Sequence, residues 1–459
     1  MSRYREDVQA LLDDGWSFAG LYALDSPSRV RTVFANGAAI RVETVEVDDG
    51  VVPSIVDLVP AANWDEREAH DLRGVAFDGH EPLRPLVDHD LDLASWTVEV
   101  RGDDAYQVAV GPIHAGVIES GHFRFHVVGE KILHLDARLF YKHRGLERAA
   151  EGASLDGGAR FVGRACAACA VTNGVAYAQA VEQARGLRSV PDLARARTIL
   201  LELERVWSHL NDVSAVCAGT GLAAGATRFA GLTQRARRLN ERLTGHRFLF
   251  GTIEVGGSAL TLDGEAVAAA RDELAGLGRE AASGWRELLF NRSFQDRLPG
   301  VGIVRARDAR RLGASGPAAR ASGVEQDARA DSPELAYDDF APVVPTRALG
   351  DVQARLEQRH LELVQSLELL PRLLDRPLAP CAAENGLPES DIGAARVESP
   401  RGATLCVVER EGDRLGRVHL RTGSYANWPV VAFAAAGNML PDFPLINKSF
   451  ELCYACADR

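Results

Sequence analysis

Two Cys-x-x-Cys pairs constrain this chain more than any other sequence feature. Cys166 and Cys169 lie in "RACAACAV", and Cys453 and Cys456 lie in "FELCYACADR", where the chain ends. Chain ends usually fray, and a pair of exposed thiols there is a liability. If both pairs serve one site, the fold must bring the end of the chain back into its interior.

A single Cys-x-x-Cys pair is a weak signal, because it can be a redox pair, half of a zinc site or chance. Cysteines at i and i+3 share one face of a helical turn, so both sulfurs of a pair can reach one metal ion. Zinc ribbons place their pairs about 15–20 residues apart, whereas most of this chain separates Cys169 from Cys453. Four thiolates can hold zinc, iron or nickel, and the residues alone do not choose among them. The other cysteines are isolated and are interpreted as small buried hydrophobic residues: Cys217, Cys381 and Cys406.

Composition limits the class of protein. The chain has 459 residues, of which 46% are hydrophobic and 25% charged, so a large core can be buried. The net charge of −12 argues against a nucleic-acid partner. No apolar run reaches the roughly 18 residues that a membrane span needs, and the charged N-terminal stretch is not a signal peptide. We expect a cytoplasmic protein that reaches the membrane only through partner subunits.

Residues 1–90 are predicted to form a small α/β domain. An amphipathic helix precedes three strand-like runs, and the charged segment 63–89 is interpreted as an ordered connector. The helix and strands are expected over residues 4–15, 18–24, 29–35 and 39–47.

Residues 91–459 are predicted to form a second, larger domain. Alternating residues over 106–139 predict strands, and four long patterns of helical period predict a helical bundle. Residues 313–345 are interpreted as a long ordered loop and 395–430 as a β element. The expected fold class is therefore α+β, with a mainly helical second domain and peripheral β elements. The four bundle helices are expected over 191–219, 226–245, 264–290 and 348–370.

The two cysteine motifs and their surroundings resemble those of nickel–iron hydrogenase large subunits. "YKHRGLERAAEG" followed by "GRACAACAVTNGVAYAQAVE" is similar to the first motif of that family and the segment before it. "NKSFELCYACADR" is similar to the last motif, and "ESPRG" matches the arginine motif of the family.

Other segments point to a subgroup. "ELERVWSHL", "GTIEVGG", "GASGPAARASG" and "RTGSYANWP" resemble the 49-kDa subunit of respiratory complex I, and residues 1–90 resemble its 30-kDa subunit. This fusion resembles the large subunit of energy-converting, formate hydrogenlyase-type hydrogenases. The resemblance implies that residues 91–459 catalyse hydrogen evolution or oxidation, and that residues 1–90 are a docking domain without metal chemistry.

The resemblance also implies the metal ligands. Cys166, Cys169, Cys453 and Cys456 would hold nickel. Cys169 and Cys456 would also bridge to an iron that carries carbon monoxide and cyanide. The resemblance implies no iron–sulfur cluster in this chain, because no third cysteine group is present to hold one.

Three further residues take roles from the resemblance. Arg401, in "ESPRG", would lie over the open metal positions. Glu119, in "IESGHFRF", matches the proton-transfer glutamate, and Glu147, in "RGLE", matches a carboxylate that holds a second metal, magnesium or iron, in some relatives. By their residue types alone, Glu119 would be a surface carboxylate and "ESPRG" an ordinary turn.

The motifs differ from the family pattern at four positions. Ala167 and Asn173 stand where a glycine and a histidine are usual, and Glu451-Leu452 stands where Asp-Pro is usual. All four thiols are retained, which favours metal binding. Relatives lose a C-terminal extension to a maturation protease after nickel enters. We expect Arg459 to be the processed end; the alternative is that the gene encodes no extension.

The expected partners follow from the same resemblance. They are a small subunit that carries an iron–sulfur cluster, membrane-anchor subunits, a formate dehydrogenase, the maturation protease and nickel-insertion proteins. Two alternatives stay open. One is a metal-free complex I-type subunit that handles quinone, although such subunits lack the paired cysteines. The other is a structural subunit with a zinc tetrathiolate.

Overall fold

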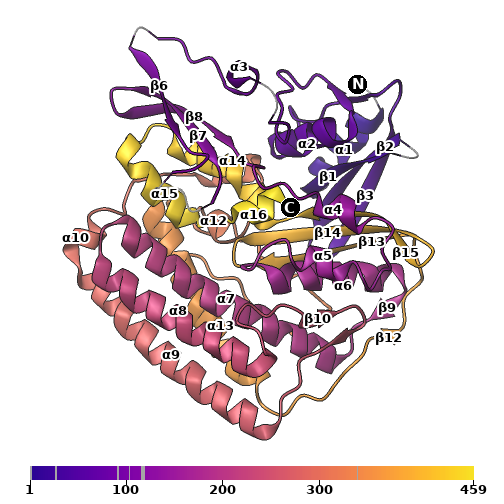
Figure 1. The fold of residues 1–459 in the computed structure, drawn as a ribbon, viewed down its shortest axis with the longest axis vertical. Helices are drawn as coiled ribbons and strands as arrows, with labels where there is room; N and C mark the ends of the chain where they lie inside the picture. The colour runs from indigo at the N-terminus through magenta and orange to yellow at the C-terminus, as the bar shows by residue number, and fades with distance from the viewer. Residues whose placement is uncertain (1–2, 26–27, 90–91, 103, 115–118, 339) are drawn as a thin grey trace.

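The computed structural model describes residues 3–25, 28–89, 92–102, 104–114, 119–338 and 340–459. They form a mixed α+β fold in which a β-rich N-terminal region is followed by a largely helical region with small sheets (Figure 1). The predicted fold class is confirmed. No described helix is both long and apolar enough to cross a membrane.

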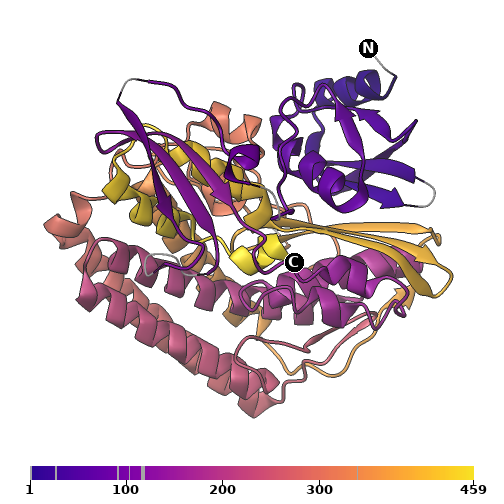
Figure 2. The ribbon, with the colours of Figure 1, turned by 45° about the horizontal axis from the view of Figure 1, so that its top comes forward.

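The N-terminal region is built on an antiparallel sheet, β1-β2-β3, in which each strand pairs with the next. The three strands match the predicted runs within two residues. Figure 2 shows this region lying along the sheet formed by residues 392–421, and the two share a small buried apolar cluster that includes Val33 and Leu405. Its elements are α1 (Arg3–Asp13), β1 (Ser17–Asp25), β2 (Ser28–Asn36), β3 (Ala39–Glu46), β4 (Val51–Pro53), η1 (Pro60–Ala62), α2 (Asn63–Arg73) and β5 (Ala76–Asp78).

The segment 63–89 is more than a connector, because it contains α2. Asp65 and Glu66 lie in the first turn of this helix, where negative charge complements the helix dipole. Gly74 ends the helix in the left-handed conformation, and β5 then pairs in parallel with β4. The helix was not predicted because the segment is rich in charged residues, yet α2 packs on β1.

Four long helices form the bundle, and all four were predicted. They are α7 (Pro191–Gly219), α8 (Ala223–Thr244), α9 (Gly264–Phe290) and α13 (Val352–Leu373). Asp351 caps α13 by accepting a hydrogen bond from the Ala354 backbone N–H at 2.8 Å, so this helix starts later than residue 348. Buried apolar residues of α7, α8, α9 and α13 belong to one large core cluster.

An antiparallel sheet, β13-β14-β15, lies against α6 (Ala170–Ala184). Its strands are β13 (Ile392–Ser399), β14 (Gly402–Glu411) and β15 (Arg414–Arg421). The predicted β element 395–430 ends early, because Thr422 caps the helix α14 (Gly423–Ala435) through a hydrogen bond from the Tyr425 N–H. The last strand of the sheet is therefore followed directly by a largely buried helix.

A third three-stranded sheet, β6-β7-β8, stands at the upper left of Figure 1. The last segment of the chain runs between this sheet, the bundle and the N-terminal region. The predicted loop 313–345 contains one short helix, α12, among its described residues. The remaining elements are α3 (Leu93–Trp96), β6 (Ala105–Val110), β7 (His122–Val128), β8 (Lys131–Arg138), α4 (Leu146–Ala150), α5 (Ala159–Val162), β9 (Leu187–Arg188), β10 (Ile253–Glu254), β11 (Gly257–Ser258), α10 (Arg292–Gln295), α11 (Ala306–Arg311), α12 (Gly316–Arg320), β12 (Glu384–Asn385), η2 (Leu440–Asp442), α15 (Phe443–Phe450) and α16 (Tyr454–Asp458).

Candidate metal centre

The fold brings the two cysteine pairs together. The Sγ atoms of Cys166 and Cys456 lie 3.1 Å apart, and the sulfurs of Cys166, Cys169 and Cys456 all lie within 4.8 Å of one another. These three residues are buried, and the half-buried Cys453 packs against them. A group of four thiols at this spacing can surround one soft metal ion.

The two pairs reach the site in different local structures. Cys453 and Cys456 span the first turn of α16, as the helical spacing predicted. Cys166 and Cys169 instead lie in the turn before α6, where the Cys169 N–H donates to the Cys166 Sγ at 3.2 Å. The expectation of a helical turn is wrong for this pair, because α6 begins only at Ala170.

The surroundings favour thiolates at two of the four positions. Hydrogen bonds from Cys166 and Cys456, with the nearby charge of Arg401, hold the pKa values of Cys169 and Cys453 well below the ordinary thiol value. Metal binding requires deprotonated sulfur, so surroundings that stabilise thiolates favour the binding of a metal cation.

The end of the chain is fastened through backbone groups of the two cysteines and through the Asp458 side chain. Ser424 accepts a hydrogen bond from the Cys453 N–H at 3.0 Å, and Thr422 donates one to the Cys456 carbonyl at 3.1 Å. Asp458 accepts two more, from the Phe140 and Lys142 N–H groups at 2.7 and 2.9 Å. This segment is therefore ordered by polar contacts to β15, α14 and the chain after β8, which explains why a terminal cysteine pair can be buried.

Arg401 lies in the turn between β13 and β14 and is buried. Its guanidinium forms a two-pronged ion pair with Asp212 of α7, at 3.0 and 2.8 Å. Burial opposes the charge of Arg401, but Asp212 and the thiols of Cys169 and Cys453 raise its pKa. Arg401 is thus a permanent positive charge whose orientation is set by Asp212 beside the cysteine cluster.

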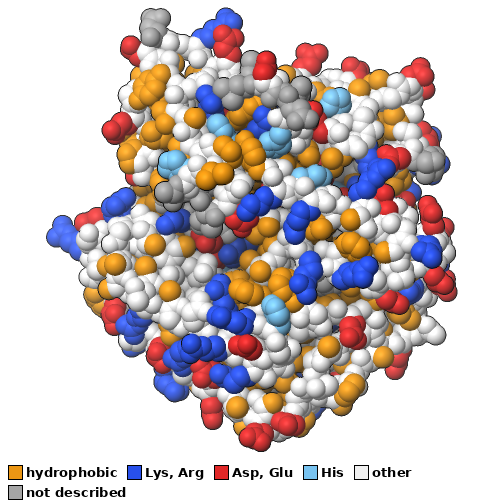
Figure 3. Space-filling view, in the orientation of Figure 1, with side chains coloured by type: hydrophobic (Ala, Val, Ile, Leu, Met, Phe, Trp, Pro, Cys, Tyr) orange, Lys and Arg blue, Asp and Glu red, His pale blue; other side chains and the backbone are white. Residues whose placement is uncertain are grey.

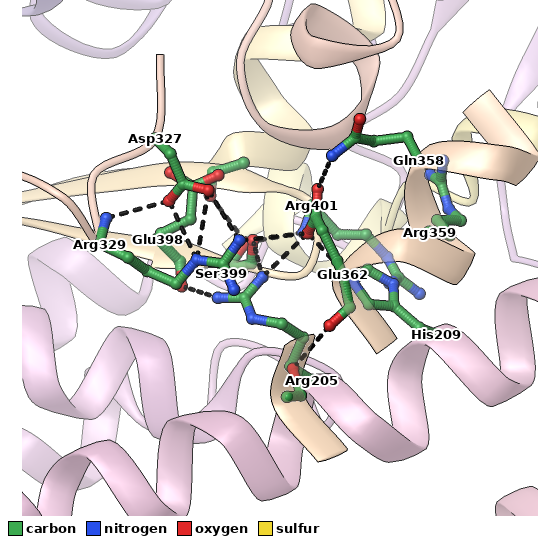
Figure 4. A network of polar contacts seen from close by, with 12 residues as sticks. Arg205, His209, Asp327, Arg329, Gln358, Arg359, Glu362, Glu398, Ser399 and Arg401 are labelled. Atoms are coloured by element: carbon green, nitrogen blue, oxygen red, sulfur yellow. Dashed lines mark hydrogen bonds and ion pairs between the residues drawn. The ribbon is translucent and has the colours of Figure 1, made fainter. Parts of the chain in front are cut away.

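Asp212 also connects Arg401 to a buried ionic network. It contacts Arg359 at 3.1 Å and His209 at 3.1 Å, and the other ring nitrogen of His209 lies 3.1 Å from Glu362. Figure 4 shows the network continuing from Glu362 between α7, α13 and the β13 strand. Its further members are Arg205, Arg320, Asp327, Arg329 and Glu398.

Sequence reasoning missed this network. The signal was available in part, since His209 and Asp212 have the i, i+3 spacing of side chains on one helical face. Both lie on α7, where the spacing of the apolar residues predicted a helix in the core and gave no reason to expect buried polar partners. The partners Arg359 and Glu362 come from α13, and no local pattern joins that helix to α7.

Glu119 lies next to the C-terminal cysteines. Its carboxylate accepts a hydrogen bond from the Ala455 N–H at 3.1 Å, between Cys453 and Cys456. Partial burial and the Cys453 thiol raise the pKa of Glu119 to about 7. The default interpretation as a solvated surface carboxylate does not fit this position.

Two other carboxylates lie near the cluster, the buried Glu204 and the half-buried Glu451, and the sequence predicted no role for either. Glu204 accepts hydrogen bonds from the Val171 and Thr172 N–H groups at 2.7 and 3.2 Å, just after Cys169. Burial, followed by the Cys169 thiol, raises the pKa of Glu204 to about 8. Glu451, one of the departures from the family pattern, has a buried oxygen with no hydrogen-bond partner among the described residues.

Glu147 is surrounded by positive charge. Arg459 lies 2.9 Å and Arg417 lies 3.0 Å from its carboxylate, and the Leu420 N–H donates to it at 2.9 Å. A second metal ion, magnesium or iron, needs several neighbours with free lone pairs, but the guanidinium groups of Arg459 and Arg417 are cations that have only N–H donors. His419, at 3.6 Å, is one further nitrogen side chain. The side chains around Glu147 therefore do not fit a second metal ion.

Comparisons with known proteins agree with this architecture. A family model described as "Respiratory-chain NADH dehydrogenase, 49 Kd subunit" matches residues 223–385 and 382–459, and one described as the 30 Kd subunit matches residues 6–94. Formate hydrogenlyase subunit 5 of Escherichia coli is 32% identical over 92% of this chain and 79% of its own length. Hydrogenase-4 component G of the same organism is 32% identical over 90% of this chain and 77% of its own.

A solved structure has the same fold. It is a chain of the membrane-bound sulfane sulfur reductase, an archaeal respiratory membrane complex, with a TM-score of 0.71 and 27% identity. The alignment covers 78% of this chain and 99% of that chain.

The chain belongs to the family of complex I 49-kDa and hydrogenase large subunits, with a 30-kDa-like region fused ahead of it. Within that family of oxidoreductases it is the large subunit of an energy-converting hydrogenase or complex I-like module. The four-cysteine cluster is consistent with the nickel–iron site of hydrogenase large subunits.

Proposed function

We propose that the chain is the catalytic large subunit of a nickel–iron hydrogenase that interconverts dihydrogen with two protons and two electrons. The observation that carries this proposal is the four-thiol cluster, assembled from opposite ends of the catalytic region. Metal-free complex I-type subunits lack such a cluster. A structural zinc site needs only its four ligands, whereas this cluster also has a buried arginine and several carboxylates around it, as sites that tune a metal do.

The residues divide into three roles in this proposal. All four cysteines would hold nickel, and Cys169 and Cys456 would also hold the iron. A nickel–iron centre with carbon monoxide and cyanide on the iron would supply the redox chemistry by which protons and electrons combine. Arg401, fixed by Asp212, keeps a positive charge and directed N–H donors beside the thiolates.

Glu119 is the proposed proton relay. A relay must lie within hydrogen-bond reach of the site and must exchange a proton near neutral pH. Glu119 contacts the backbone between the two C-terminal cysteines, and its half-buried position leaves it in contact with solvent. Protons would pass between Glu119 and the thiolate of Cys453 or Cys456.

Partner subunits complete the proposed enzyme. Electrons require an iron–sulfur cluster on a small subunit, and membrane-anchor subunits would place the complex on the cytoplasmic side of the membrane. Basic side chains gather across the middle of one face around a hollow (Figure 3), although the chain carries a net charge of −12. A face of this charge suits a partner with acidic groups. We further propose that residues 1–90 form a docking domain and residues 91–459 the catalytic domain, and that a formate dehydrogenase, a maturation protease and nickel-insertion proteins act with it.

Elemental analysis of the purified complex tests the proposal against its alternatives. We expect close to one nickel per chain, together with iron at the cysteine cluster. Zinc in place of nickel would support a structural tetrathiolate, and the absence of any cysteine-bound metal would support a quinone-handling subunit. Cysteine-to-serine variants separate this iron from the iron of a partner's cluster.

A further inference from the structure

Arg459 lies at the junction between the N-terminal region and the metal-binding segment. Its guanidinium forms one ion pair with Glu147 of α4, at 2.9 Å, and another with Glu68 of α2. The same group donates to the Leu420 carbonyl and lies over the Tyr425 ring, 4.8 Å from its centre. Arg459 is buried, and the Glu147 and Glu68 side chains that it contacts are 12% and 10% exposed.

The two carboxylates come from different regions of the chain. Glu68 is a buried residue of the N-terminal region, and Glu147 belongs to α4, in the segment before the first cysteine motif. Without a cation between them, two largely buried carboxylates facing one site would repel each other. A planar guanidinium can satisfy both at once, because its N–H groups form a fork.

The position of Arg459 joins this ionic junction to the thiols. Arg459 follows Cys456 by one helical turn, and its backbone N–H donates to the Ala455 carbonyl at 3.1 Å. Its own carbonyl accepts a hydrogen bond from the Arg144 N–H at 2.8 Å. A shift of the guanidinium would therefore move the turn of α16 that carries Cys453 and Cys456.

We infer that the Arg459 guanidinium takes the place of a second metal ion between Glu147 and Glu68, and that Glu68 is a positioning residue for the C-terminal cysteine pair. We call this trio the arginine clamp. The cysteine cluster then depends on the N-terminal region through one buried carboxylate. This inference rests on the proposed role of the cysteines as metal ligands.

The test uses the full complex with three variants. Glu68→Gln keeps the side chain's size but removes its charge. Arg459→Lys keeps the positive charge but loses the fork. Glu409→Gln is the matched control, because Glu409 joins the same two regions through Tyr22 at 2.7 Å and Arg31 at 2.8 Å.

Two measurements are made on each variant: hydrogen exchange of the amides of residues 453–459, and the rate at which a chelator removes the cysteine-bound metal. We expect both rates to rise by roughly tenfold or more in Glu68→Gln and Arg459→Lys, because breaking a buried pair is costly. Glu409→Gln should leave both rates at the wild-type value. If Glu68→Gln does not fold, Arg459→Lys decides the question alone.

The inference is overturned if Glu68→Gln and Arg459→Lys behave like Glu409→Gln. It is also overturned if the wild-type complex holds a stoichiometric divalent ion that Glu147→Gln removes. If the cysteine-bound metal is zinc, the proposed function fails, yet the exchange of residues 453–459 still tests the arginine clamp.

Discussion

Cys453 has a structural position that differs from the other three ligand candidates, because it is only half-buried and precedes α16. Cys453→Ser should abolish nickel retention and hydrogen turnover, since a serine hydroxyl stays protonated at neutral pH and is a harder ligand than a thiolate. Nickel content and turnover measured on one preparation check this prediction.

Cys381→Ser is the matched control for that variant. Cys381 is also partly exposed but lies outside the cluster. The control should keep both nickel and turnover. Full nickel occupancy in Cys453→Ser would remove Cys453 from the ligand set.

Glu119 can be tested separately from metal binding. Glu119→Gln keeps the size of the side chain and an acceptor for the Ala455 N–H, but it cannot release a proton. Nickel content should therefore stay unchanged while turnover falls by roughly 100-fold or more, the scale of a lost acid–base group. Normal turnover with normal nickel would exclude Glu119 from proton transfer.

At the scale of elements, Asp212 joins α7, α13 and the turn between β13 and β14. Asp212→Asn leaves Arg401 and Arg359 buried without their shared carboxylate. We expect the free energy of unfolding to fall by about 3–5 kcal/mol, as for other broken buried pairs. Denaturant unfolding of the variant and the wild-type chain measures this difference.

A surface ion pair gives the comparison for Asp212→Asn. Glu287 pairs with Arg228 at 2.5 Å between α9 and α8, but 66% of its side chain is exposed. Glu287→Gln should change the free energy of unfolding by less than about 0.5 kcal/mol. Equal losses in the two variants would contradict the importance assigned to the buried network.

The long helices could be predicted from the sequence because their periodicity and end signals are local. Pro191 and Gly219 mark both ends of α7, and the bounds of α9 were also predicted. The meeting of the two cysteine pairs at one site could also be predicted, because both motifs resemble those of one metal-binding family. The buried network could not be predicted, because its members pair across α7, α13 and the β13 strand, and pairing of that kind is set only by tertiary packing.

At the scale of the whole molecule, ion pairs join the N-terminal region to the rest of the chain. Arg421 contacts Asp65 at 2.8 Å, and Arg73 contacts Glu151 at 2.7 Å. The arginine clamp adds a contact to the segment that carries Cys453 and Cys456. That residues 1–90 form a docking domain stays a prediction.

A lower pH should weaken the ion pairs between Glu147 and its arginine partners. Burial opposes ionisation of Glu147, but Arg459 and Arg417 hold its pKa well below the usual value of 4.5. A carboxylate with a lowered pKa adds stability above its unfolded-state pKa and loses it as pH falls toward the folded-state pKa. Glu147→Gln should therefore destabilise the protein at neutral pH, with a difference from wild type that shrinks below about pH 4.5. Urea midpoints measured from pH 7 to pH 3 check this, and a constant difference would contradict it.

An infrared spectrum of the metal-loaded complex tests the central claim most directly. If the cysteines hold a nickel–iron centre, bands of carbon monoxide and cyanide bound to iron should be present. They should disappear in Cys453→Ser and persist in Cys381→Ser. A complex that contains its full complement of cysteine-bound metal but shows none of these bands would contradict the assignment as a nickel–iron hydrogenase.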